Sequence, residues 1–200
     1  MLSKAGCSLV FAPDEKEMYP EEDIRVFDFG NLDKVMEGAH RPGHFNGVGQ
    51  IVSKLFDAVK PDAAYFGEKD FQQLAIIKKM VKDMGYAIRI VPCPIVREAD
   101  GLAMSSRNMR LSPDQRREAV SISKTLFRAK ELWSKTGVTD LKKWVVDELS
   151  RNPAFRVEYF DIVDDVALQS VNSKEEKCGK VGCIAVQVGA IRLIDNIRFE

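Results

Sequence analysis

The feature that most constrains the fold is an alternation of helical and strand-like patterns over residues 44–92. From His44 onward, apolar residues recur at helical spacing, and Pro61 ends the pattern soon after its last member. The members of this stripe are Val48, Ile51, Val52, Leu55, Phe56 and Val59. The run "AAYF" then reads as a buried strand, and a second stripe, formed by Leu74, Ile77, Val81 and Met84, predicts a helix that ends at Gly85.

The run "AIRIVP" is strand-like again, and two earlier runs, "CSLVFAP" and "IRVFDF", could also be strands. Strands that alternate with helices in this way imply a parallel sheet with helices on its faces. We therefore expect an α/β domain over residues 1–95.

The alternation stops after Pro92 and Pro94, where "VREADGLAMSSRNMRLSPDQ" forms a long polar connection of the kind that is usually functional. Ser112, Pro113 and Gln115 then predict a capped helix, with Ala119, Ile122, Leu126 and Trp133 facing inward. A shorter helix is expected around residues 141–149. The alternating tail "FRVEYFDIVDD" and the runs in "CIAVQVGAIRLIDNI" predict a small antiparallel sheet. We therefore expect a second, smaller α+β domain over residues 96–200.

The charge pattern excludes several classes of partner. Thirty basic residues balance thirty acidic ones, and no Lys/Arg block marks a nucleic-acid or membrane surface. No apolar run approaches the ~20 residues of a membrane span, and the opening "MLSKAGCS" lacks a secretory signal core. The four cysteines are scattered, which favours reduced thiols. We expect a cytoplasmic protein with small-molecule or protein partners.

The two histidines do not predict a metal site. Pro42 and Gly43 separate His40 from His44 and argue against one helical face that carries both. The close cysteine pair in "CGKVGC" has no second pair or nearby histidine to complete a zinc site.

The segment "FGEKDFQQL" has two interpretations. It follows a predicted parallel strand, where helix N-termini point unpaired N–H groups at ligands. Gly67 would permit close backbone approach, Lys69 would supply a cation, and Asp70 could accept hydrogen bonds from ribose hydroxyls. In the alternative, Asp70 and Gln73 form a capping box and the charges of Glu68 and Lys69 are simply solvated.

Two further segments also remain open by themselves. "MSSRN", residues 104–108, offers hydroxyls, a guanidinium and backbone N–H groups suited to phosphate oxygens, or it is a surface turn before a capped helix. Arg41 and His44 in "RPGHF" could face an anionic ligand, or they could merely begin the long helix.

Taken together, the segments are more specific. "RPGHFNGV", "FGEKDFQQL", "VREADGLAMSSRN" and "RLIDN", in this order and spacing, closely resemble the pantoate-beta-alanine ligase family over essentially the whole chain. The resemblance implies a Rossmann-like sheet of the nucleotidylyl transferase type and a two-step reaction. Pantoate attacks ATP, accompanied by Mg²⁺, to form pantoyl adenylate and pyrophosphate, and beta-alanine then displaces AMP.

The resemblance also assigns residues by position. Gly67, Glu68, Lys69 and Asp70 match the ATP segment, and Gln73 matches the pantoate-binding glutamine. Val96 matches a position whose backbone meets adenine. Met104, Ser105, Ser106 and Arg107 match a flexible loop that clasps the triphosphate, similar to the Lys-Met-Ser-Lys-Ser loop of class I tRNA synthetases. Arg41 and His44 are candidates for the substrate pocket, and no residue is assigned to a metal.

The sequence departs from the family in one respect. The family carries a His-x-Gly-His loop that stabilises the transferring phosphate and a second strand with Asn and Gln contacts to pantoate, whereas neither His40 nor His44 belongs to that signature. The sequence therefore looks like a ligase without its first ~80 residues, the length of two strand-helix units. On this interpretation we expect no adenylate formation by this chain alone, and self-association through uncovered strand edges in a typically dimeric family.

Two alternatives to a ligase remain open. The chain could be a non-catalytic module that binds nucleotide or associates with itself, which an assay for AMP release would distinguish. It could also be a tRNA synthetase-like nucleotidyltransferase fragment, because loops like "MSSRN" occur across that superfamily. The balanced charge argues against the second alternative.

Overall fold

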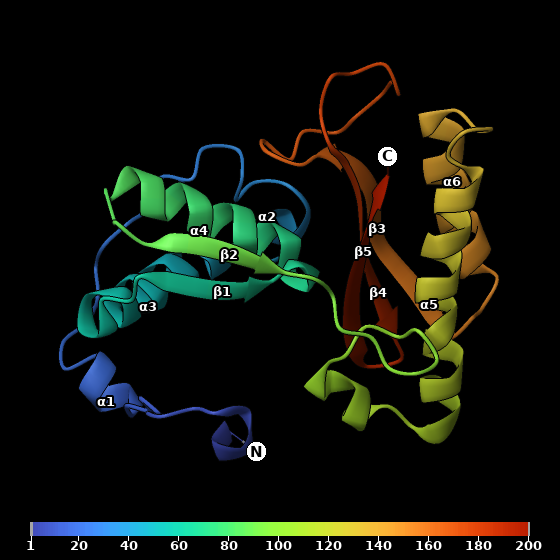
Figure 1. Cartoon of the computed structure of the whole chain (residues 1–200). Coiled ribbons are helices and arrows are strands. Elements are labelled where there is room, and N and C mark those ends of the chain that lie inside the picture. The colour runs from blue at the N-terminus through green and yellow to red at the C-terminus, as the bar shows by residue number, and fades with distance from the viewer. Residues whose placement is uncertain (1, 200) are drawn as a thin grey trace.

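A computed structural model describes residues 2–199 and contains two separate sheets (Figure 1). The first sheet pairs β1 (Ala63–Gly67) with β2 (Arg89–Cys93) in parallel, so that Ala63 lies opposite Arg89 and Gly67 opposite Cys93. Helices α3 (His44–Val59) and α4 (Phe71–Asp83) accompany it, and a 3-10 turn, η2 (Glu68–Asp70), joins β1 to α4. The expected parallel alternation is confirmed over residues 44–93.

The apolar stripes of α3 and α4 pack against each other and against the strands. Their buried core consists of Phe29, Phe45, Val48, Phe56, Ile76, Ile77, Met80 and Val81. Gly85 adopts a positive φ of 68° immediately after α4, which confirms the expected end of that helix. Met84 was expected on the buried stripe, but its side chain is 42% exposed because α4 ends one residue earlier.

The strands expected at residues 7–13 and 24–29 are absent from the described structure, and both segments are extended chain without ladder pairing. At residues 24–29 no described strand pairs with the chain, because side chains of α3 occupy the backbone hydrogen-bonding groups that strand pairing would use. Asn46 accepts the Phe27 N–H at 2.9 Å, and Gln50 donates to the Arg25 carbonyl at 2.8 Å. Phe29 is buried, whereas Val26 on the other side of the segment is 87% exposed. Short elements η1 (Leu2–Ala5) and α1 (Glu15–Met18) precede this segment.

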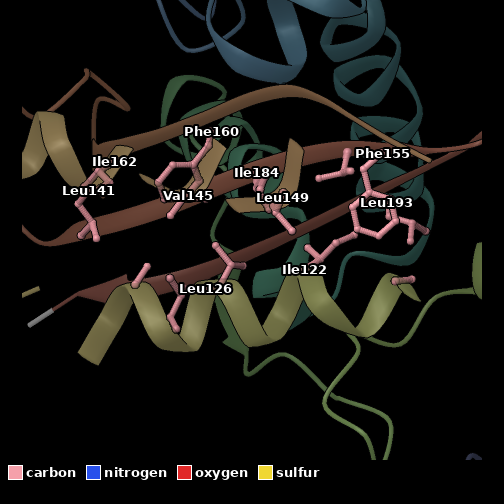
Figure 2. Close-up of a cluster of buried hydrophobic side chains, with 14 of the residues drawn as sticks. Ile122, Leu126, Leu141, Val145, Leu149, Phe155, Phe160, Ile162, Ile184 and Leu193 are labelled. Carbon is pink, nitrogen blue, oxygen red and sulfur yellow. The ribbon is translucent and has the colours of Figure 1, made fainter. Parts of the chain in front are cut away.

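The second sheet confirms the expected antiparallel arrangement. Strands β3 (Phe155–Asp164), β4 (Lys180–Val188) and β5 (Ile191–Phe199) pair in the order β3-β4-β5. Helices α5 (Pro113–Leu132) and α6 (Val138–Ser150) cover one face of it. Figure 2 shows the two layers interdigitating, with Ile122 and Leu126 of α5 and Leu141, Val145 and Leu149 of α6 directed toward the strands.

The start of α5 has the expected cap. Ser112 accepts the Gln115 N–H at 3.2 Å, Gln115 accepts the Ser112 N–H at 3.0 Å, and Pro113 occupies the first turn. Ala119, Ile122, Leu126 and Trp133 are all buried, as expected. Because these signals lie close together in the chain, the sequence alone was sufficient to place this helix.

The two parts of the chain meet where α2 (Met36–His40) and the start of α4 pack on the face of the second sheet opposite α5 and α6. A small buried cluster joins them, formed by Met36, Phe71, Val163, Leu168, Val181 and Cys183. The connection after β2 crosses between the parts and contains η3 (Ser106–Arg110). None of the described helices is both long enough and apolar enough to cross a membrane. All four cysteines are free thiols.

Candidate functional site

A cavity of about 260 Å³ lies at this junction, beyond the carboxyl end of β1. Its walls come from α2, the start of α3, the β1–α4 connection, η3 and all three strands of the second sheet. Eight of the residues expected at a site line it: Arg41, His44, Lys69, Asp70, Gln73, Ser105, Ser106 and Arg107. Three segments that are distant in the sequence therefore converge on one cavity.

Gly67 and Glu68 do not line the cavity. Gly67 ends β1 at the mouth, and a Cβ built there would meet no heavy atom within 4 Å, so its exposed face is open to a ligand. The Glu68 carboxylate turns away and pairs with Arg198 at 3.1 Å. Glu68 was expected to belong to an ATP-binding segment, and its side chain anchors that segment to β5.

Lys69 connects the ATP segment to the loop segment. Its Nζ donates to the Met104 carbonyl at 3.2 Å, and the Met104 N–H donates to the Val96 carbonyl at 3.0 Å. Burial lowers the pKa of the Lys69 ammonium, and Arg107 contributes in the same direction against the opposing effects of Asp70 and Asp195. No carboxylate forms an ion pair with Lys69 among residues 2–199. Val96 and Met104 do not line the cavity, but these bonds place both beside it.

Residues 104–107, the MSSR loop, are held by a short turn at Ser105 and by contacts to β5 and Lys69. Ser105 Oγ accepts the Arg107 N–H at 3.2 Å, and Arg107 Nη1 donates to the Arg192 carbonyl at 3.3 Å. Within the described residues no carboxylate pairs with Arg107. The guanidinium therefore keeps donors that an anion could use.

Arg41 and His44 form the opposite wall. Arg41 Nη1 lies 3.0 Å from His44 Nε2 and 3.8 Å from a Glu37 carboxylate oxygen. Burial lowers the pKa of His44, and the neighbouring Arg41 charge lowers it further. His44 therefore favours the neutral form, with Nε2 accepting from Arg41.

The structure tests the capping interpretation of Asp70. Asp70 is the N-cap residue of α4, but its side chain accepts no hydrogen bond from the helix, and its ψ of 61° is not the extended conformation of a capping residue. The capping-box alternative for Asp70 and Gln73 is therefore wrong. The Asp70 carboxylate and the Gln73 side chain both border the cavity.

Sequence reasoning missed Glu37, Tyr159 and the individual roles of the motif "RLIDN". The Arg192 guanidinium donates to both Glu37 oxygens at 2.8 and 2.6 Å and to Glu158 at 2.8 Å. Tyr159 O–H donates to Glu37 at 2.8 Å, and the same Glu37 raises the already burial-raised pKa of Tyr159. This network docks α2 onto β3 and β5.

Asp195 and Asn196 of the same motif bind the connection after β2 and the turn η2, which form other walls of the cavity. Asp195 forms a two-point pair with Arg97 at 2.7 and 3.0 Å, and Asn196 Nδ2 donates to the carbonyls of Glu68 and Lys69 at 2.8 and 3.0 Å. A signal for these residues was present, because a strand with Arg, Asp and Asn beside buried apolar positions needs partners for its polar groups. Nothing in the sequence identified the partners.

As a whole the cavity suits an anionic ligand. Arg41, Lys69 and Arg107 bring three cations to it, and two serine hydroxyls stand beside them. The carboxylates of Glu37 and Asp195 are already neutralised by arginines, which leaves Asp70 as a polar acceptor at the rim. Unpaired cations and hydroxyls on a short loop are the groups that bind polyphosphate oxygens.

Comparison with known proteins agrees with this geometry. The sequence model of the family described as pantoate-beta-alanine ligase matches residues 1–198. The chain belongs to this family. Proteins named pantothenate synthetase from Bacteroides thetaiotaomicron and Porphyromonas gingivalis are 56% and 52% identical to it over 200 residues. In both cases the match covers 100% of this chain and 71% of the relative.

Solved structures of the ligase family share the fold. The crystal structure of pantothenate synthetase from Thermus thermophilus has a TM-score of 0.93 and 40% identity, covering 100% of this chain and 72% of that one. A pantoate-beta-alanine ligase from Francisella tularensis, solved with beta-gamma ATP and beta-alanine, has a TM-score of 0.77 and 29% identity, covering 98% and 67%. The expected nucleotidylyl transferase type of fold, with its additional α+β part, is therefore confirmed.

Proposed function

We propose that the cavity is the ATP- and pantoate-binding part of a pantoate-beta-alanine ligase site. The family performs the ATP-dependent ligation of pantoate and beta-alanine. The observation that carries the assignment to this cavity is the convergence of three cations: Lys69 and Arg107, which pair with no carboxylate in the described residues, and Arg41, whose one carboxylate contact is to Glu37 at 3.8 Å. A phosphate chain supplies the negative charge that these groups lack.

Within this site the triphosphate lies against Lys69 and the MSSR loop. The Lys69 ammonium and the Arg107 guanidinium neutralise phosphate oxygens, and the hydroxyls of Ser105 and Ser106 donate to them. The Ser105–Arg107 turn is held by two local bonds, from the Arg107 N–H to Ser105 Oγ and from the Asn108 N–H to the Ser105 carbonyl, and by one bond from Arg107 to β5. Because most of these bonds are local, the turn can move as a unit onto the phosphates.

The nucleoside lies along the mouth of the cavity. The open Cβ position of Gly67 lets its backbone approach the ribose, and the uncapped Asp70 carboxylate accepts from ribose hydroxyls. Val96 is 66% exposed, and since its carbonyl is used by Met104, its N–H remains the group that meets adenine.

Pantoate lies on the opposite side, against Gln73, with Arg41 and His44 at its carboxylate. In the first step a pantoate carboxylate oxygen attacks the α-phosphorus, and the bond to the leaving pyrophosphate breaks. In the second step the beta-alanine amine attacks the pantoyl carbonyl carbon, AMP leaves, and the amine loses its proton. The cations of this chain act by neutralising charge on the phosphates and by holding both substrates in place.

We propose that Mg²⁺ enters with the nucleotide. Among residues 2–199 no group of three or more His, Cys, Asp or Glu side chains could hold a metal ion. Mg²⁺ commonly binds through substrate phosphates and one or two carboxylates, and Asp70 is the carboxylate at the cavity that no arginine neutralises.

The binding proposal is tested by calorimetric titration of ATP in Mg²⁺ buffer. Arg107→Ala and Lys69→Ala should each weaken binding about tenfold to a hundredfold, the effect of one lost charge-assisted hydrogen bond. Arg110→Ala is the matched control, because Arg110 lies on the same 3-10 turn but outside the cavity lining. Equal losses in Arg107→Ala and Arg110→Ala would contradict a specific phosphate site.

Turnover is a separate question. The 200 residues contain no His-x-Gly-His sequence, and we propose that this polypeptide alone forms no pantoyl adenylate above background. The measurement is AMP and pyrophosphate release with ATP, pantoate and beta-alanine. Release at a rate typical of ligases would show that other residues replace the histidine loop. Neither the non-catalytic module nor the tRNA synthetase-like alternative gains support from the comparisons.

We further propose two domains, 1–95 and 96–200, and a homo-oligomer. Support for the domains comes from the separate sheets and cores on either side of residue 95. Support for association comes from β1 and β2, which pair only with each other in the described structure and leave open edges. Light scattering across micromolar concentrations tests association, and a stable monomer would contradict it. The cytoplasmic location remains a prediction.

A further inference from the structure

Two neighbouring residues of β5 hold Lys69 in place. Asn196 binds its main chain directly, and Asp195 acts on its ammonium through Arg97 and Met104. At the main-chain end, Lys69 sits in the turn η2, which α4 does not stabilise through a side-chain cap. The Asn196 amide holds the turn itself from across the junction, since its Nδ2 donates to the carbonyls of both Glu68 and Lys69. Asn196 is only 5% exposed, and its two N–H groups match the two carbonyls.

The ammonium end of Lys69 is held indirectly by Asp195, the residue before Asn196 on β5. Asp195 binds Arg97 by two hydrogen bonds, and Arg97 begins a narrow hairpin in which it pairs with Ala103. Met104 follows in the returning strand of this hairpin, and its carbonyl accepts the Lys69 ammonium. Arg97 also donates to the Gly101 carbonyl within the hairpin and lies over the Phe127 ring of α5, so the same guanidinium contacts the hairpin, β5 and α5.

We propose that Asp195 and Asn196 are positioning residues that together aim the Lys69 ammonium into the cavity. The inference rests on the proposed function in that the aimed group is taken to meet ATP phosphate. Asn196 sets the direction in which the side chain leaves the turn, and Asp195 sets the place of its carbonyl partner. Neither residue needs to touch the nucleotide.

The physical benefit is a lysine that is ordered before the ligand arrives. A lysine has four flexible side-chain bonds, and a free one must be ordered on binding, which weakens affinity. Here the turn and the Met104 carbonyl restrict the chain beforehand. When ATP binds, the ammonium replaces its hydrogen bond to the Met104 carbonyl by one to a phosphate oxygen, and little further side-chain conformational entropy is lost.

Asn196→Leu is the sharpest test, because leucine keeps nearly the same shape, removes both donors and changes no charge. In calorimetry we expect ATP affinity to fall about tenfold. The loss should vanish in a Lys69→Ala background, where no ammonium remains to be aimed, and persist in an Arg107→Ala background. A full additional loss on top of Lys69→Ala would overturn the proposal.

Ile197→Val is the control for a general weakening of β5. Ile197 is the next residue along the strand, is buried in the core on the α5 side, and its side chain is apolar and cannot hydrogen-bond η2. The substitution should lower Tm while leaving the ATP Kd unchanged. A similar loss of affinity in Ile197→Val would reduce Asn196 to a structural role and overturn the assignment.

A ligand-free measurement separates this inference from the proposed function. NMR titration of the lysine ammonium groups, with Lys69 assigned by its loss in Lys69→Arg, follows its environment without ATP. The charged groups around it are Asp70, Asp195 and Arg107, and Asn196→Leu leaves all three in place. We expect the Lys69 pKa to return toward the ordinary lysine value as the side chain leaves its half-buried position.

The ATP titration tests the proposed function, and the Lys69 titration tests the positioning role, so either proposal can fail without the other. If the parent chain binds no ATP but the Lys69 titration shifts in Asn196→Leu, the proposed ATP site is wrong and the positioning holds. If the parent binds ATP but the titration is identical in parent and variant, Asn196 does not orient Lys69, and the inference that Asp195 and Asn196 act together is overturned.

Discussion

Arg192 on β5 and Glu37 on α2 form a bidentate salt bridge, with Nη1 and Nη2 at 2.8 and 2.6 Å from the two carboxylate oxygens. The residues are 155 positions apart in the chain, and both side chains are largely buried. Because Glu37 precedes Arg41 on the same short segment, this pair sets where the Arg41–His44 wall stands relative to the second sheet.

Removing Arg192 is expected to lower the free energy of unfolding more than removing the charge of Glu37. Arg192→Met leaves two largely buried carboxylates, Glu37 and Glu158, without their guanidinium and should cost about 3 to 5 kcal/mol in unfolding free energy. Glu37→Gln leaves Arg192 with Glu158 and should cost about 1 to 3 kcal/mol. Urea denaturation measures both. Lys143→Met, which removes an exposed pair on α6, is the control and should leave the unfolding free energy nearly unchanged. Equal costs for the two buried variants would contradict the asymmetry.

Gly67→Ala should separate ligand contact from folding. The φ of Gly67 is −67°, and the added methyl meets no atom of the protein, so the unfolding free energy should stay the same or rise by up to about 1 kcal/mol. The same methyl would stand between the backbone and a nucleotide, so ATP affinity should fall. Thermal melting and calorimetry on one sample provide both values. An unchanged ATP Kd would show that the nucleotide does not approach Gly67.

Asp70→Ala and Ser112→Ala form a matched pair of N-cap substitutions. Ser112 makes a complete capping box, so its removal should cost about 1 kcal/mol and leave ATP binding unchanged. Asp70 makes no side-chain cap, so its removal should leave the unfolding free energy nearly unchanged and weaken ATP binding. If Asp70→Ala melted like Ser112→Ala, the Asp70 carboxylate would be capping α4 in solution after all.

His44 should make the folded chain less stable in acid. Burial and Arg41 lower its pKa in the folded state below the ordinary value of 6.5, so the unfolded chain binds the proton more readily. The contribution of His44 is therefore complete above about pH 6.5 and is lost as pH falls through the folded pKa. Urea denaturation between about pH 5 and 8 should show a steeper loss of stability in the parent than in His44→Gln. Parallel curves would mean that His44 titrates normally.

Several elements were predictable because their causes are local. The apolar stripe from Val48 to Val59 predicted α3, and the reciprocal spacing of Ser112 and Gln115 predicted the start of α5. In each case the deciding contacts lie within four residues of one another, as helix periodicity and capping require. The alternation of apolar and polar residues likewise predicted β3, and two apolar runs on either side of Gly189 predicted β4 and β5.

Other elements were not predictable because a strand requires a neighbour. The run at residues 24–29 has strand composition, but its backbone is bound by Asn46 and Gln50 of α3. Asp70 has the spacing of a cap, but Asn196 holds the preceding carbonyls and the Asp70 backbone is not extended. In the first case side chains distant in the sequence took the place of a neighbouring strand, and in the second the backbone conformation at Asp70 prevented the cap that the spacing predicted.

Residue order and short-range spacing were enough to identify the family, the segments that border the cavity and the start of α5. Which charges remain available in the cavity depends on contacts between distant parts of the chain. Glu37 and Asp195 are neutralised by Arg192 and Arg97, whereas Lys69 and Arg107 keep free donors, because each charge responds to neighbours that are distant in the chain and close in space.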